Sequence, residues 1–336
     1  MVGDKRQKSI EILTGGRLDA IFLVTAPFFG LVFMGYVAAR SGFVPLSAIP
    51  GLNSFVLYFA LPCMLFEFGA KTPFEKLVDP RVAAVYGVSA VILVAVSVML
   101  ARRNRLSTKD GAFGAITAAF PNAGFIGVPL LVTMMGPDAA GPVILMIAID
   151  MILVSSGCLA LSESDHKGGA WMTLRSSLKA IARNPMPIAI VVGAVSSWLG
   201  IYLFGPLEKL VGLLSNAASP VALFTIGAVL WRSAVYAQRA DFRHQPYLDV
   251  VVLKLLLHPV MIWGLGLGLN LVGMGPDPFA LAVMVLCAAL PSASNVSLLA
   301  ERFGADNSRI ARIILVTTVI SFFSFSLVAW LIGVEV

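Results

Sequence analysis

Long apolar stretches alternate with short polar segments along nearly the whole chain. Each stretch is almost free of Asp, Glu, Lys and Arg, and each is about as long as a helix needs to cross a hydrocarbon core roughly 30 Å thick. Backbone groups in lipid must satisfy their own hydrogen bonds, so every stretch is expected to be helical. The pattern predicts ten spans, at 20–39, 46–70, 82–101, 111–135, 140–162, 185–204, 210–230, 247–271, 279–300 and 310–333.

Composition supports an all-α membrane protein. Of the 336 residues, 58% are hydrophobic and 12% are charged, whereas soluble domains have about 25% charged residues. This excludes an ordinary soluble enzyme and a disordered chain. The three cysteines lie far apart inside apolar stretches, and we interpret them as packing residues. The motifs H-E-x-x-H, C-x-x-C and G-x-x-x-x-G-K-[ST] are absent, so we expect no metal, no cofactor and no enzymatic activity.

Lys and Arg are concentrated in the segments that follow the first, third, fifth, seventh and ninth expected spans. Such loops stay on the cytoplasmic side of a membrane. The bias therefore predicts that these loops are cytoplasmic and that both termini face the outer side. We interpret the polar segment 1–18 as an N-terminal tail, not as a cleaved signal peptide. The net charge of +6 comes from these loops, and no nucleic-acid partner is expected.

Two short patterns recur in the same order in the two halves of the chain. P-x-x-L-F-x-x-G-A begins at Pro62 and again at Pro220, and A-A-x-P ends at Pro121 and again at Pro291. The first pair is 158 residues apart and the second pair 170. The order favours two five-helix repeats, at 19–162 and 185–336, joined by a cytoplasmic linker at 163–184. An odd number of spans inverts the second repeat, which is a plan found in transporters.

Pro121 and Pro291 each lie near the middle of an expected span. A proline inside a helix removes a hydrogen bond and clashes with the preceding turn, and small or polar residues follow both prolines. A simple kink is one interpretation, and a pair of broken, crossing helices is the other. Broken helices would present free N–H groups and positive dipole ends, which suit an anion. The candidate substrate-binding residues at these breaks are Pro121, Asn122, Gly124, Pro291, Ser292, Ser294 and Asn295.

The run 121–130, PNAGFIGVPL, resembles the fourth-helix motif of the auxin efflux carrier family, whose members include plant auxin carriers and bacterial malate or malonate permeases. The runs 288–295 and 300–306 are similar to the family's ninth-helix motif. The resemblance spans nearly the whole chain. It implies ten helices with both termini outside, helices 4 and 9 crossing at the two prolines, and elevator-like alternating access for organic anions. It also implies that Asn122 contacts the substrate.

Charged residues inside expected spans are costly unless they are functional or paired. Lys254 is a candidate to supply charge to a carboxylate substrate; the alternatives are a pair with Asp150 or an amino group that snorkels to the cytoplasmic surface. Asp150 and Glu67 are candidates to carry a coupled proton, and Glu67 is alternatively an interfacial carboxylate. His258 is a third coupling candidate, unless it simply bonds a backbone carbonyl.

These observations predict a secondary carrier of a small organic anion in the cytoplasmic (inner) membrane. A membrane-embedded enzyme and a channel or sensor are the alternatives. The expected partners are the organic anion and the lipid bilayer. A coupling ion, proton or sodium, and a second copy in a homodimer are left open.

Overall fold

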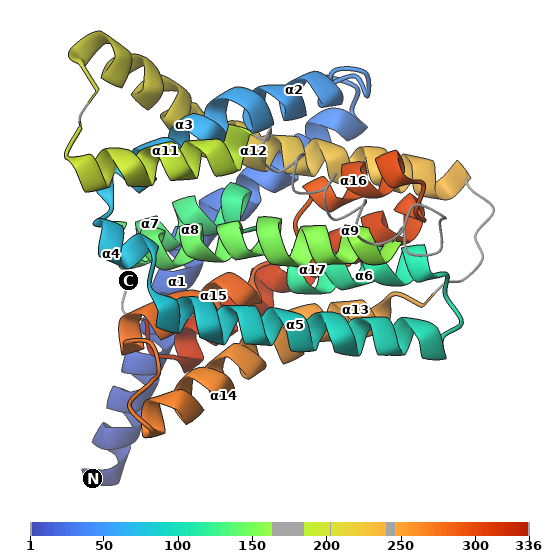
Figure 1. The fold of residues 1–336 in the computed structure, drawn as a ribbon. Helices are drawn as coiled ribbons and strands as arrows, with labels where there is room; N and C mark the ends of the chain where they lie inside the picture. The colour runs from blue at the N-terminus through green and yellow to red at the C-terminus, as the bar shows by residue number, and fades with distance from the viewer. Residues whose placement is uncertain (1, 163–184, 202, 240–245, 335–336) are drawn as a thin grey trace.

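The computed structural model describes residues 2–162, 185–201, 203–239 and 246–334. The linker predicted at 163–184 lies outside the described residues. Helices are the only regular elements in the described part, which contains no β-strand. Figure 1 shows the long helices running roughly side by side, with the start of the chain and its C-terminal end drawn toward the same end of the bundle.

Seven apolar segments are long enough to cross a membrane: Leu18–Arg40, Ile49–Lys71, Phe74–Arg103, Pro137–Ser162, Gly205–Arg232, Leu248–Leu271 and Asn307–Leu331. Shorter apolar helices occupy Ala123–Met135, Pro185–Leu199 and Pro278–Ala289. The prediction of an all-helical, multi-pass membrane protein is confirmed in this form. The expected spans 111–135 and 279–300 are each divided between two helices. Residues 2–17, interpreted above as a tail, are helical and continuous with the first span.

The seven long segments contain these elements, in chain order: α1 (Val2–Arg40); α2 (Ile49–Phe55), η1 (Val56–Ala60) and α3 (Leu61–Lys71); α4 (Phe74–Leu77) and α5 (Pro80–Arg103); η3 (Pro137–Ala139), α8 (Ala140–Ile149), η4 (Asp150–Ser155) and α9 (Ser156–Ser162); α12 (Gly205–Arg239); α13 (Leu248–Val252), η5 (Leu253–Leu257) and α14 (His258–Leu271); and α17 (Asn307–Leu331). The remaining elements are α6 (Thr108–Ala119), η2 (Ala123–Gly127), α7 (Val128–Met135), α11 (Pro185–Leu199), α15 (Pro278–Ala289) and α16 (Asn295–Phe303).

Short polar side chains define where several of these helices begin. Ser107 accepts a hydrogen bond from the N–H of Asp110 at the start of α6, and Asp277 accepts one from Ala280 at the start of α15. A side-chain acceptor at this position satisfies one of the free N–H groups of the first turn. The two helices that later stop at Pro121 and Pro291 therefore have defined starting points.

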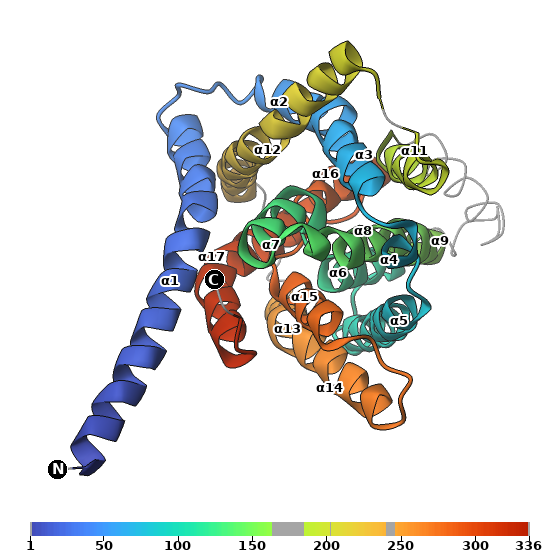
Figure 2. The same ribbon diagram turned by 90° about the vertical axis from the view of Figure 1, so that its left-hand side faces the viewer.

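One group of helices, the peripheral unit, consists of α1, α2, α3, α11 and α12. Within it α1 packs along α12, and α3 packs against α11 and α12, an arrangement that Figure 2 shows as an arc along one side of the molecule. Glycine makes the first contact close: a Cβ on Gly35 would lie 1.9 Å from the carbonyl oxygen of Phe224, and one on Gly227 1.8 Å from that of Val32. Small residues allow such backbone contact between membrane helices.

The second group, the crossover unit, contains α5 to α9 and α13 to α17. Its strongest contacts join α5 to α6, α14 to α15 and α6 to α9.

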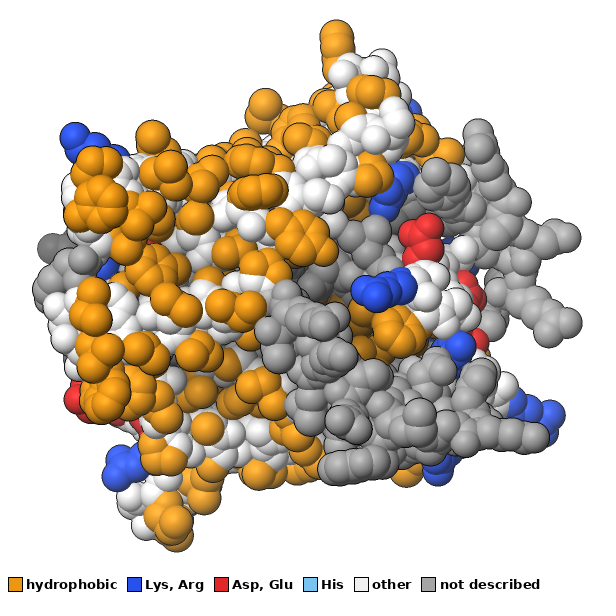
Figure 3. Space-filling model, turned by 45° about the horizontal axis from the view of Figure 1, so that its top comes forward, with side chains coloured by type: hydrophobic (Ala, Val, Ile, Leu, Met, Phe, Trp, Pro, Cys, Tyr) orange, Lys and Arg blue, Asp and Glu red, His pale blue; other side chains and the backbone are white. Residues whose placement is uncertain are grey.

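Apolar side chains cover much of the outer surface of the whole molecule, with Lys and Arg toward its ends, as Figure 3 shows for one face. Exposed Trp198, Leu213 and Phe323 are examples. Such a surface is expected where lipid replaces water around the helices.

Candidate functional site

Two helices of the crossover unit stop where their prolines occur. Helix α6 ends at Ala119 and α15 ends at Ala289, because a proline has no N–H with which to continue the helical ladder. The two extended segments pair with each other through an antiparallel bridge between Pro121 and Ser292. Asn122 donates its N–H to the carbonyl of Pro291 at 2.8 Å, and Ala293 donates to that of Phe120 at 3.0 Å. Backbone atoms of each interruption thus hydrogen-bond to the other.

New helical segments begin directly after this pairing. The segment η2–α7 starts at Ala123 and α16 starts at Asn295. The described part of the chain offers no hydrogen-bond acceptor to the N–H groups of Gly124, Phe125, Ser294 and Asn295. Free N–H groups and the positive end of the helix dipole attract anions. Two such ends are held at one place inside the protein.

Side chains at the pairing add polar atoms. Asn122 is 2% exposed, and its Oδ1 has no hydrogen-bond partner in the described structure; the Oδ1 of Asn295 has none either. Ser294 is buried nearby. Gly124 lies against α11, where an added Cβ would be 3.6 Å from Cε of Met186. A buried amide oxygen without a hydrogen bond costs about 1–3 kcal/mol of stability, and such groups commonly have a water or ligand partner.

Ser292 is different, because its polar groups are already used. Its Oγ donates to the carbonyl of Thr117 at 2.7 Å, and its N–H donates to Oγ1 of Thr317 at 3.2 Å. Both threonines are fully buried. The sequence analysis missed Thr117 and Thr317, since a threonine in an apolar span gives no signal unless its partner across the fold is known.

A second buried polar cluster lies beside the helix ends. Tyr86 of α5 donates its hydroxyl to Oδ1 of Asp150 at 2.7 Å, and its ring centroid lies 5.9 Å from that of His258. Lys254 donates through Nζ to the carbonyl of Ala288 at 2.9 Å, and the same Nζ lies 3.1 Å from Nδ1 of His258. The side chains of the four ionisable residues have no solvent exposure. Asp150 begins η4 and Lys254 lies in η5; π-helical turns of this kind are frequent at functional sites.

The cluster changes the interpretation of the embedded charges. Lys254 does not snorkel, because it is fully buried, and in the described structure it makes no ion pair with Asp150 within 4.0 Å. His258 bonds no backbone carbonyl among the described residues; its Nε2 and Oδ2 of Asp150 have no partner there. Tyr86, which contacts both Asp150 and His258, was missed because a single tyrosine in an apolar span is ordinary.

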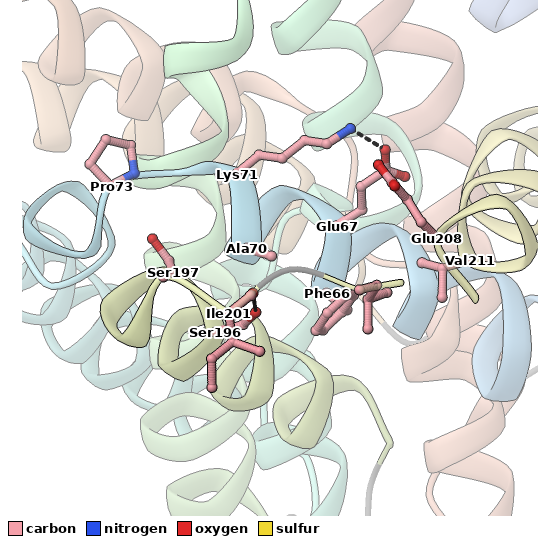
Figure 4. A pocket seen from close by; sticks show the side chains of 12 residues that line it. Phe66, Glu67, Ala70, Lys71, Pro73, Ser196, Ser197, Ile201, Glu208 and Val211 are labelled. Atoms are coloured by element: carbon pink, nitrogen blue, oxygen red, sulfur yellow. Dashed lines mark hydrogen bonds and ion pairs between the residues drawn. The ribbon is translucent and has the colours of Figure 1, made fainter. Parts of the chain in front are cut away.

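Glu67 is not part of either group. Its carboxylate pairs with Lys71, one turn further along α3, in a pocket of about 400 Å³ between α3, α11 and the start of α12. Figure 4 shows Glu208 of α12 close to this pair, with Ser196 and Ser197 on the α11 side. The structure therefore brings together the residues around Pro121 and Pro291, places the Asp150–Lys254 cluster beside them, and leaves Glu67 in a separate pocket.

Comparison with known proteins identifies relatives of this chain. A "Putative malonate transporter" of Rhizobium meliloti (strain 1021) is 31% identical over 303 residues, covering 88% of this chain and 90% of the relative. "Uncharacterized transporter YfdV" of Escherichia coli (strain K12) is 25% identical, covering 82% and 86% of the two chains. An "Uncharacterized transporter" of Methanothermobacter thermautotrophicus is 23% identical, covering 88% and 93%.

The sequence profile of one family, described as membrane transport protein, matches residues 20–329. This match includes both proline-interrupted helices and the Asp150–Lys254 cluster. It confirms the resemblance to the auxin efflux carriers that the motifs indicated. The chain belongs to this family of membrane transport proteins.

Proposed function

We propose that this protein is a secondary active carrier of a small carboxylate in the cytoplasmic membrane. The observation that supports it best is the pair of helix starts after Pro121 and Pro291, with N–H groups that have no acceptor in the described structure. Two positive dipole ends in a buried setting favour an anion over a neutral solute. No motif for a nucleotide is present in the sequence, so the driving force we propose is a gradient or the membrane potential.

We further propose ten spans arranged as two inverted five-helix repeats, with the broken helices crossing at the substrate site. Glycine contacts support this. The α3–α11 contact is also close, because a Cβ on Gly193 would lie 2.7 Å from the carbonyl of Phe66 and one on Gly69 3.4 Å from Cα of Gly193. Gly35 and Gly193 are 158 residues apart, as are Gly69 and Gly227. The glycines of the α1–α12 contact thus correspond to those of the α3–α11 contact in the proposed repeats. Their separation of 158 residues is the same as that of the first repeated motif.

The proposed cargo is a dicarboxylate of about the size of malonate. One relative is named for malonate, and the two helix ends offer one N–H pair to each of two carboxylates. The side-chain Oδ1 atoms of Asn122 and Asn295 have no partner in the described structure. These amide side chains are suited to select between cargoes, because an amide presents both donors and an acceptor.

Uptake by proteoliposomes tests the cargo. Purified protein would be reconstituted, and entry of radiolabelled malonate would be followed with succinate, acetate and a neutral diamide as competitors. We expect saturable uptake, inhibition by dicarboxylates, and counterflow when the vesicles are preloaded with malonate. Uptake that does not saturate and shows no counterflow would indicate a channel; labelled product released without vesicles would indicate an enzyme.

An elevator motion of the crossover unit against the peripheral unit is the proposed route. Phe29 of α1 contacts Phe322 of α17 across the two units, with ring centroids 5.1 Å apart, whereas Tyr36 of α1 and Trp231 of α12, 5.5 Å apart, lie within the peripheral unit. Cysteine pairs would replace each aromatic pair in a chain lacking Cys63, Cys158 and Cys287. Cross-linking of the first pair is expected to stop transport reversibly, and cross-linking of the second to leave it unchanged. Normal transport with the first pair cross-linked would rule out the elevator while leaving the carrier proposal standing.

A further inference from the structure

The helix ends at the pairing have opposite polarities. The starts of η2–α7 and α16 are positive ends, whereas the carboxyl ends of α6 and α15, at Ala119 and Ala289, are negative ends with carbonyl groups that lack a helical partner. An anion bound at the positive ends neutralises their partial charge, but the partial negative charge of the carbonyl ends is left without a counter-charge. In carriers with discontinuous helices, such carbonyl ends are where coupling cations bind.

One carbonyl on this side already accepts a hydrogen bond from a lysine of the protein itself. In an unbroken helix the oxygen of Ala288 would accept from the N–H of residue 292. Here the N–H of Ser292 is directed to Oγ1 of Thr317 instead. Lys254 takes the place left vacant, with Nζ 2.9 Å from the oxygen of Ala288 and with no exposure to solvent.

The corresponding end of α6 has a neutral partner. The oxygen of Ala119 would accept from the N–H of Ala123, but that N–H bonds to Pro121 at 2.7 Å. The hydroxyl of Tyr86 lies 3.5 Å from the oxygen of Ala119. Among the described residues, one amino group lies at this pair of negative helix ends, and it belongs to the side chain of Lys254.

We propose that the Lys254 ammonium is a built-in counter-cation at the carboxyl end of α15, in the place where a coupling sodium would otherwise bind, so that transport is independent of sodium. This inference rests on the proposed carrier function and gives Lys254 an indirect role. It is a positioning residue that holds the broken end of α15 and contributes positive charge to the anion site without contacting the anion.

The first test uses the unaltered protein. Malonate uptake by proteoliposomes would be compared in sodium and in choline buffers at equal ionic strength, and equal rates are expected. A sodium stimulation of about tenfold, which corresponds to about 1.4 kcal/mol of coupling, would overturn the inference and leave the carrier function intact. Absence of malonate uptake in both buffers would refute the proposed cargo instead. The thermal unfolding temperature in the same two salts then decides: no difference between sodium and choline supports the inference, and a sodium-specific rise overturns it.

The second test removes the ammonium and returns it as a free molecule. Lys254→Ala deletes the atoms of n-propylammonium. We expect the variant to lose about tenfold or more of its uptake, and n-propylammonium or sodium to restore part of the uptake and to raise the unfolding temperature. Neither cation should affect the wild type. Lys76→Ala, which removes a half-exposed lysine paired with Asp138, is the matched control and should behave as the wild type. A Lys254→Ala protein that transports normally, or that responds to neither cation, would contradict the inference.

A double variant separates this role from simple neutralisation of Asp150. If Lys254 only balances the carboxylate, Lys254→Ala combined with Asp150→Asn would transport without added cation, and the inference would fall. We expect the double variant to need the cation still, because the oxygen of Ala288 remains without a donor.

Discussion

Replacing Asn122 by alanine should lower transport while leaving the protein at least as stable. The Asn122 N–H still bonds to the carbonyl of Pro291 after the substitution, so the pairing of the two broken helices is kept. Oδ1 of Asn122 is buried and has no partner among the described residues, so its removal relieves a penalty of about 1–3 kcal/mol in the empty protein. A hydrogen bond from the amide to a charged carboxylate is worth about 1.5–3 kcal/mol. Its loss therefore corresponds to a fall in affinity of about tenfold to a hundredfold.

Two assays in parallel check this prediction. Malonate uptake against concentration should show a raised half-saturation value, and thermal unfolding in detergent should show an unchanged or higher transition temperature. Asn104→Ala is the control, because this asparagine bonds to Asp249 at the exposed end of α5 and should not affect uptake. Unchanged uptake together with a marked loss of stability would show that Asn122 holds the fold, and would refute its assignment to the substrate.

Three further substitutions test the packing and the buried polar groups. Gly227→Ala places a methyl group 1.8 Å from a carbonyl oxygen of α1 and should cost about 3 kcal/mol or more in unfolding free energy. Gly212→Ala is on the same helix, where the added group would meet no other part of the described structure within 4 Å beyond its own helix backbone; it should be neutral or slightly stabilising in the same thermal assay. Tyr86→Phe removes the donor to the buried carboxylate of Asp150 and should lower the unfolding free energy by about 1–3 kcal/mol, with full stability being the contrary result. Ser292→Ala deletes one hydrogen bond to α6 and should cost about 0.5–1.5 kcal/mol, with a smaller effect on malonate affinity than Asn122→Ala; a larger effect would mean that this hydroxyl leaves its carbonyl to bind substrate.

The spacing of apolar stretches was sufficient to locate most of the membrane-spanning helices, because lipid imposes both a length and a helical backbone on them. The interpretation of 1–18 as a tail stays a prediction; the structure adds that residues 2–17 are helical and continue into the apolar part of α1. Polarity alone does not show whether such a segment is helical, because a helix that extends an apolar span needs no apolar face of its own.

At the site, the prolines indicated where α6 and α15 stop, because the missing N–H of proline is a property of the sequence itself. The partners of the buried side chains could not be found in this way. Lys254 contacts a carbonyl 34 residues away, and Tyr86 contacts a carboxylate 64 residues away. Such contacts depend on how the helices pack against one another. No periodic pattern in the sequence reveals that packing.

The pairing of the two interrupted helices uses main-chain atoms, from Asn122 to Pro291 and from Ala293 to Phe120. Main-chain hydrogen bonds are insensitive to the identity of most side chains. Mutations at the polar positions beside the prolines can therefore alter what the site accepts while the pairing of the two helices is kept. Descendants of one ancestral gene could in this way acquire different cargoes in a few steps, each of them a folded intermediate.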